Sequence, residues 1–211
     1  MLRIMMIAAA LAAVQWASAT RADACNGDKT LFQDDFSVHD ATWGVPSADF
    51  EMKDGKAVLK PAPAMSRWQL QTGFAFGDAD ICLTVTLLET SDPTRSSAGV
   101  AFWAKDARNL YVLSIAPNGF YQVSRLIAGN WAPEVISWTP SDAIKQGPNQ
   151  PNNLRVTLKG QSVAVMINDK DLVRFRAQPP ETQSNVGLYA VSGPAKADAW
   201  QFTDLKVTNV K

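Results

Sequence analysis

Short segments of alternating apolar and polar residues follow one another along most of the chain. Alternation with a period of two is typical of β-strands that bury one face. Turn-forming pairs separate several of these segments, most clearly Asp54-Gly55, Asn118-Gly119 and Lys159-Gly160. No window shows a sustained apolar period of 3.6 residues, and only residues 141–144 suggest a helical turn.

About a dozen short strands, spaced roughly 8–12 residues apart, are typical of an all-β sandwich. The pattern therefore predicts a two-sheet jelly-roll sandwich. No clear linker or fixed-period repeat interrupts it, so we expect residues 25–211 to form a single domain. The expected strands are 50–53, 56–59, 81–88, 98–104, 111–115, 120–127, 154–158, 163–167, 172–175, 186–191 and 202–210.

Residues 1–24 have the layout of a secretory signal peptide. A short basic start precedes an apolar segment that is too short to span a bilayer comfortably, and small residues then offer cleavage after Ala19 or after Ala24. No later segment is apolar enough to form a membrane helix. The sequence therefore predicts an exported protein, periplasmic or secreted, without a membrane span.

The two cysteines, Cys25 and Cys82, are both retained after cleavage at either site. Two cysteines in an exported protein usually pair, so we expect a disulfide between the mature N-terminus and the strand 81–88. The alternative is that Cys25 is the lipidated first residue of a lipoprotein. A zinc site is excluded because the chain has two cysteines and one histidine, too few well-spaced ligands for a tetrahedral site.

The charge balance limits the partners. The chain has 20 Lys and Arg residues and 20 Asp and Glu residues, and no block of one sign. Without a basic excess to neutralise phosphates, a nucleic acid is an unsuitable partner.

A row of aromatic residues follows the central predicted strands. Exposed on a sheet, such rings would stack on the apolar faces of sugars while nearby polar side chains bind the hydroxyl groups. The alternative is that the rings belong to the core, because aromatic residues are common in strands for packing alone. The candidate ligand-binding residues are Trp103, Tyr111, Tyr121, Arg125 and Trp131.

Catalytic and metal sites are poorly supported by the sequence. Retaining β-glucanases carry Glu-x-Asp-x-Glu on one strand, and no glutamate here has an aspartate two residues later. His39 has no Gly-x-Ser-x-Gly nucleophile to serve and is interpreted as a loop residue. Pairing of the first and last strands would bring together Asp34, Asp35 and Asp204, a candidate site for structural calcium.

Asp34-Asp35-Phe36-Ser37, followed by Trp43, is the first of several motifs that occur in one order along the chain. Together these motifs resemble the concanavalin A-like jelly-roll domains of the LamG-like and DUF1080 group (3-keto-disaccharide hydrolase, family-16-like), and the resemblance extends over nearly the whole mature chain. The terminal strand of these relatives often carries Phe-Asp-Asn, where this chain has Phe202-Thr203-Asp204. The other matching segments are 99–102, 109–111, 119–121, 153–156, 163–168, 186–188 and 202–207.

The resemblance implies an extracytoplasmic protein that contacts carbohydrate. We therefore expect an exported, lectin-like β-sandwich that binds a glycan or envelope polysaccharide without cleaving it. One alternative is a sugar-derivative hydrolase of the DUF1080 type. The other is an envelope module that binds a protein partner or has a structural role, with its aromatic residues buried.

Overall fold

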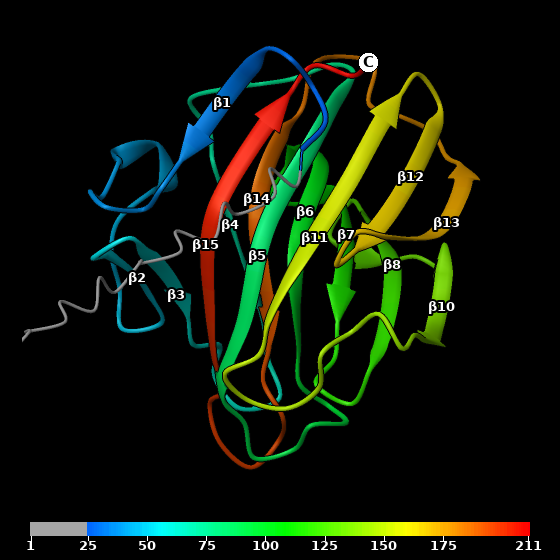
Figure 1. The fold of residues 1–211 in the computed structure, drawn as a ribbon. Coiled ribbons are helices and arrows are strands. Elements are labelled where there is room, and N and C mark those ends of the chain that lie inside the picture. The colour runs from blue at the N-terminus through cyan, green and yellow to red at the C-terminus, as the bar shows by residue number, and fades with distance from the viewer. Residues whose placement is uncertain (1–24) are drawn as a thin grey trace, which may run out of the picture.

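Two antiparallel sheets pack face to face in the computed structural model (Figure 1). The structure describes residues 25–211, so the predicted signal peptide and its cleavage sites lie outside the described residues. Regular secondary structure in this part is strand, apart from one 3-10 turn, η1 (Ala41–Trp43). The predicted all-β, two-sheet jelly-roll sandwich is confirmed.

The first sheet has the strand order β13-β12-β11-β5-β15-β3-β2, and β1 also pairs with β15. The first and last strands of the described chain therefore lie side by side (Figure 1). The strands of this sheet are β1 (Thr30–Asp34), β2 (Phe50–Lys53), β3 (Lys56–Leu59), β5 (Ala79–Glu89), β11 (Pro151–Lys159), β12 (Ser162–Ile167), β13 (Lys170–Arg176) and β15 (Ala199–Thr208).

The second sheet has the strand order β10-β8-β7-β6-β14-β4, and the two-residue strand β9 pairs with β8. It lies behind the first sheet in Figure 1. Its strands are β4 (Ser66–Leu70), β6 (Ser97–Asp106), β7 (Asn109–Ile115), β8 (Phe120–Ile127), β9 (Asn130–Trp131), β10 (Ile136–Pro140) and β14 (Asn185–Val191).

The core fills the space between the sheets. Strand β11 illustrates how alternation selects it, because Leu154, Val156 and Leu158 are buried and the residues between them are partly exposed. Burial of such apolar surface is the main driving force for folding. The largest fully buried side chains are Trp43, Trp200, Phe36, Phe50, Phe102 and Phe202.

All the predicted strands are present, and four further strands were missed: β1, β4, β9 and β10. Every residue of β4 is partly exposed, so its sequence, Ser-Arg-Trp-Gln-Leu, shows no clear burial pattern. Residues 141–144 form a non-helical turn, so the prediction of a helical turn there is wrong.

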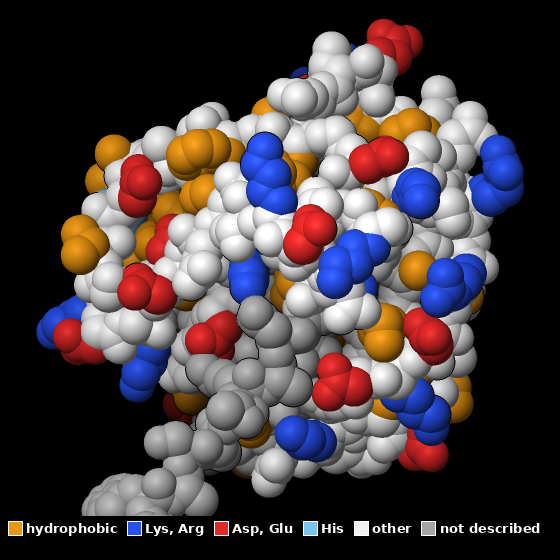
Figure 2. Space-filling view, turned by 45° about the horizontal axis from the view of Figure 1, so that its top comes forward, with side chains coloured by type: hydrophobic (Ala, Val, Ile, Leu, Met, Phe, Trp, Pro, Cys, Tyr) orange, Lys and Arg blue, Asp and Glu red, His pale blue; other side chains and the backbone are white. Residues whose placement is uncertain are grey.

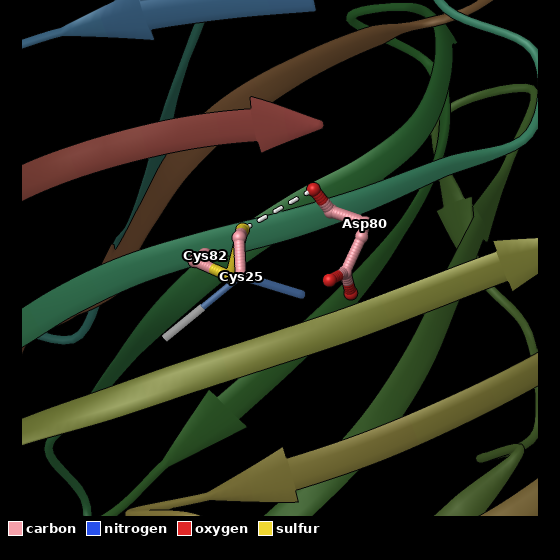
Figure 3. Close-up of side chains that lie close together, drawn as sticks. All are labelled: Cys25, Asp80 and Cys82. Atoms are coloured by element: carbon pink, nitrogen blue, oxygen red, sulfur yellow. Dashed lines mark hydrogen bonds between the residues drawn. A yellow bond between two sulfur atoms is a disulfide. The ribbon is translucent and has the colours of Figure 1, made fainter. Parts of the chain in front are cut away.

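The predicted disulfide between Cys25 and Cys82 is confirmed (Figure 3). It ties the start of the described chain to the outward face of β5. Because both sulfurs are bonded, the structure does not support the lipidated form of Cys25. Among the described residues, Cys25, Asp80 and Cys82 are the only group of three potential metal ligands that converge, and the disulfide removes the two thiolates.

A buried ion pair lies beside the disulfide. Asp80 accepts hydrogen bonds from Arg155 Nε at 2.8 and 2.9 Å, from Thr157 Oγ1 at 2.8 Å and from the backbone N–H of Asn26 at 2.9 Å. Asp80 is buried although it faces away from the core. The Asp80 carboxylate therefore accepts hydrogen bonds from both the N-terminal segment and β11.

On the face shown in Figure 2, basic and acidic side chains are interspersed, and neither sign forms an extended patch. This agrees with the even charge balance of the sequence. Within residues 25–211, no helix is long and apolar enough to cross a membrane.

Replacing both cysteines, in Cys25→Ser/Cys82→Ser, is expected to lower the free energy of unfolding. The disulfide joins residues 57 positions apart. Closing a loop of that length in the unfolded chain is worth about 4 kcal/mol in the chain-entropy model. Urea unfolding of the oxidised protein and the double variant measures the difference. Equal unfolding free energies would contradict the stabilising role.

Removing one member of the buried ion pair is expected to be costly. Asp80→Leu leaves the Arg155 guanidinium without its carboxylate, and breaking a buried pair in this way costs about 3–5 kcal/mol. The double variant Asp80→Leu/Arg155→Met is expected to recover much of that loss, because no buried charge remains. Thermal unfolding of the original protein, Asp80→Leu, Arg155→Met and the double variant measures the coupling. A loss below about 1 kcal/mol for Asp80→Leu would show that the pair is not effectively buried.

Candidate functional site

The outward face of the second sheet is apolar and hydroxylated. Strand alternation places Leu110, Val112 and Ser114 of β7 on this face, and Gln122 and Ser124 of β8 beside them. None of these side chains is acidic. The outward-facing side chains of β7 and β8 therefore include no carboxylate.

Three aromatic side chains cover part of this face. The Trp131 ring lies 6.3 Å from the Trp68 ring of β4 and 6.0 Å from the Tyr189 ring of β14, both in edge-on geometry. Trp131 belongs to β9, which pairs with β8, so its side chain reaches across the intervening strands β7 and β6. Burial raises the pKa of Tyr189, which therefore stays protonated at neutral pH. Trp131 itself is 43% exposed, and it covers a surface that would otherwise be open.

A separate cavity of about 250 Å³ lies at one end of the second sheet. The end of β6, the start of β7 and the end of β8 form its floor. The loop 177–184, which leads from β13 to β14, forms its wall. Its lining includes the aromatic side chains of Trp103 and Tyr111 and, among its polar side chains, those of Lys105, Arg125, Gln178 and Glu181.

A backbone irregularity positions Trp103. Strict alternation would place it on the outward face next to Ala101. The register of β6 instead shifts after Phe102, and Trp103 adopts a φ of 47°, which is unusual for a bulky residue. Its ring consequently packs into the core, 5.9 Å from the Phe102 ring and 5.4 Å from the Tyr111 ring. Positive φ angles of this kind store strain and cluster at functional sites.

Tyr111 joins the floor of the cavity to its wall. Its hydroxyl group donates a hydrogen bond of 3.1 Å to the carbonyl oxygen of Gln178. Burial raises the pKa of Tyr111, with an opposing effect from the Arg125 charge, so the hydroxyl group remains a donor at neutral pH. The Arg125 guanidinium carbon lies 4.9 Å from the centre of the Tyr111 ring, in a cation–π contact.

The structure brings together three of the five predicted ligand-binding residues, Trp103, Tyr111 and Arg125. Tyr121 lies elsewhere in the core, and Trp131 lies on the outward face of the sheet. The expectation of an exposed aromatic platform is wrong for the three core residues: Trp103 is 4%, Tyr111 4% and Tyr121 5% exposed. Strand packing buries their rings, and of the three only Trp103 and Tyr111 line the end cavity.

Sequence reasoning missed the polar residues of the cavity. Lys105, Gln178 and Glu181 lie in segments without strand alternation, and the two loop residues are distant in sequence from β7 and β8. The Pro179-Pro180 pair could have drawn attention to the loop 177–184, because two consecutive prolines stiffen a loop. Trp68 and Tyr189, which surround Trp131, were also missed.

The predicted calcium site does not have converging ligands. Asp34 accepts hydrogen bonds of 2.7 Å from the backbone N–H of Phe36 and from the indole N–H of Trp43, and Asp35 accepts one of 2.9 Å from the backbone N–H of Ser37. Carboxylate oxygens of Asp34, Asp35 and Asp204 do not all come within 4.8 Å of one another. The residues present therefore fit a calcium ion poorly, and calcium binding stays a prediction.

His39 lies in the loop after β1, as the sequence predicted. Its Nε2 atom lies 2.7 Å from the carbonyl oxygen of Gly44.

No protein-family model matches this chain, and no curated protein matches it. Solved structures do resemble it. A β-1,3-1,4-glucanase (lichenase) derived from a mouse hindgut metagenome aligns with a TM-score of 0.60 at 12% identity, over 85% of this chain and 99% of the other. The carbohydrate-binding module CBM66 from Bacillus subtilis aligns with a TM-score of 0.55 at 14% identity, over 72% and 86% of the two chains.

The carbohydrate recognition domain of Emp47p aligns with a TM-score of 0.56 at 16% identity, over 78% of this chain and 87% of that domain. At these identities the likeness establishes the fold alone. The chain has the concanavalin A-like jelly-roll fold that glucanases and carbohydrate-binding modules share.

Proposed function

We propose that this protein is an exported, non-catalytic carbohydrate-binding β-sandwich, and that its glycan binds in the end cavity between β6, β7, β8 and the loop 177–184. The observation that carries the proposal is the composition of this cavity. Buried aromatic rings form its apolar floor, and Lys105, Arg125, Gln178 and Glu181 offer donors and acceptors around it. Sugars present the same combination of apolar ring faces and hydroxyl groups.

The size of the site favours a glycan chain bound at one residue. Ligand pockets usually enclose roughly 300–1,000 Å³, so a cavity of about 250 Å³ suits a single sugar ring. An adjoining cavity of about 310 Å³ shares the Trp103, Pro179, Pro180 and Glu181 walls. A neighbouring sugar would extend into it.

Binding without cleavage is the better-supported reading of the end cavity. Glycoside hydrolysis requires two carboxyl groups, about 5–5.5 Å apart in retaining enzymes. Among the described residues, Glu181 is the only carboxylate that lines the end cavity. In the adjoining cavity Asp78 is also present, but its Oδ1 atom accepts a 2.8 Å hydrogen bond from the backbone N–H of Gly160. The hydrolase alternative would need this pair to act together.

Export rests on the signal-like residues 1–24 and on the disulfide, which persists in oxidising compartments. The alternative is that the protein binds an envelope protein partner. The polar groups of the cavity favour a glycan over this alternative, because binding a protein partner does not require them.

Gln178→Ala is expected to weaken glycan binding about two- to tenfold, since one lost hydrogen bond is worth about 0.5–1.5 kcal/mol. A glycan array, followed by titration calorimetry on the glycans that bind, measures the effect. Gln33→Ala is the matched control, because Gln33 is an exposed residue of β1 in the other sheet. It is expected to leave affinity unchanged.

Trp131→Ala distinguishes the end cavity from the outward face of the second sheet. If only Trp131→Ala abolishes binding, the glycan binds on that face and the cavity proposal fails. An array without any bound glycan would refute carbohydrate binding altogether. Release of reducing sugar from a bound glycan, lost in Glu181→Gln, would instead support the hydrolase alternative.

A further inference from the structure

Arg125 differs from the other arginines of the described chain. Each of the others has an ion pair or a hydrogen bond: Arg67 with Asp49, Arg95 with Asp92, Arg108 with the Ala128 carbonyl oxygen, Arg155 with Asp80, Arg174 with Asp171 and Arg176 with Gln161. Within residues 25–211, Arg125 has only the ring of Tyr111 as a partner. Arg125 lines the end cavity, and its side chain donates no hydrogen bond to another described residue.

A cation–π contact with Tyr111 favours one position of this guanidinium group before any ligand arrives. Tyr111 is buried, and its hydroxyl group is bonded to the wall of the cavity. The ring therefore offers a well-held surface, 4.9 Å from the guanidinium carbon, for this contact. A cation held in this way loses little side-chain entropy when it binds an anion, and this preorganisation favours affinity.

The charged residues that line the cavity, counted by themselves, are net positive. Lys105 lines the same cavity and has no ion pair with any described residue, whereas Glu181 is the single anion of the lining. Two positive charges and one negative charge leave an excess of one positive charge. Planar guanidinium groups bind carboxylate and sulfate-type oxyanions through two parallel hydrogen bonds.

We infer that the ligand is an acidic glycan, and that Arg125 binds the carboxylate or sulfate group of the sugar that occupies the end cavity. Lys105 adds attraction at longer range, and Glu181 accepts hydrogen bonds from sugar hydroxyl groups on the opposite wall. This inference rests on the proposed function, because it assigns a chemical class to the glycan at that site.

Titration calorimetry with uronic-acid oligomers and their methyl esters tests the inference directly. Esterification removes the charge and keeps the sugar backbone, so each ester is a matched neutral probe. Oligomers of galacturonate, glucuronate and mannuronate cover the common stereochemistries. Sulfated neutral oligosaccharides form a further arm, which separates sulfate recognition from carboxylate recognition. We expect at least one acidic oligomer to bind ten times more tightly than its neutral counterpart, with an affinity that falls as NaCl is raised.

Three variants assign the effect to Arg125. Arg125→Gln is expected to reduce affinity for the acidic oligomer at least tenfold, and Arg125→Lys to reduce it less, because the charge remains but the two-pronged geometry is lost. Glu181→Gln is expected to increase affinity severalfold, since it removes the negative charge while the amide oxygen still accepts hydrogen bonds from sugar hydroxyl groups. The matched control is Arg174→Gln, which removes the same charge from an exposed position on β13. It is expected to leave affinity unchanged, and the Tm of each variant confirms that it folds.

The outcomes separate this inference from the proposed function. Equal binding of acidic and neutral oligomers, unaffected by Arg125→Gln, would refute the acidic ligand and leave carbohydrate binding intact. Tight binding of neutral glycans alone would also refute the acidic ligand and leave carbohydrate binding intact. Absence of binding to every charged and neutral probe would refute both proposals. An equal loss in Arg125→Gln and Arg174→Gln would show a general charge effect and also overturn the inference.

Discussion

The packing of the two inner faces against each other is the constraint on which the rest of the structure depends. Strands such as β11 contribute alternate residues to the core between the sheets, and the rings of Trp43, Trp200 and Phe202 fill part of its volume. A shift of one residue in such a strand would expose its apolar side chains and bury its polar ones. Once the sheets are packed, the outward faces and the strand ends are the parts of the molecule that remain available for chemistry.

The candidate site lies where this alternation fails. The shifted register after Phe102 and the positive φ of Trp103 direct two consecutive aromatic rings of β6 toward the interior. The rings of Trp103 and Tyr111 therefore close this end of the core. The loop 177–184 crosses from one sheet to the other at this point, and its bond to Tyr111 completes the cavity. A local backbone irregularity thus converts the edge of a core into a site with polar walls.

The outward faces of the two sheets are used differently. On the first sheet, the N-terminal segment covers β5 and buries the carboxylate of Asp80 with its partner Arg155. On the second sheet, Trp131 extends over a floor of small and apolar side chains toward Trp68 and Tyr189. Both sheets therefore protect part of their outward surface with the chain itself. The end cavity keeps its charged groups accessible, which is why a ligand-binding role is assigned there.

The strands, the sandwich and the Cys25–Cys82 bond could be predicted from the sequence, because alternation, turn pairs and cysteine number are local or compositional properties. Edge strands such as β4 escaped prediction, because a partly exposed strand has no burial contrast. Trp103, Tyr111 and Arg125 could be singled out by residue type, but their burial could not. Only the tertiary structure decided that these three residues meet, that Gln178 and Glu181 join them, and that Arg125 has no ionic partner among residues 25–211. Those properties depend on a strand bulge and on a contact between residues 67 positions apart, and neither leaves a pattern in neighbouring residues.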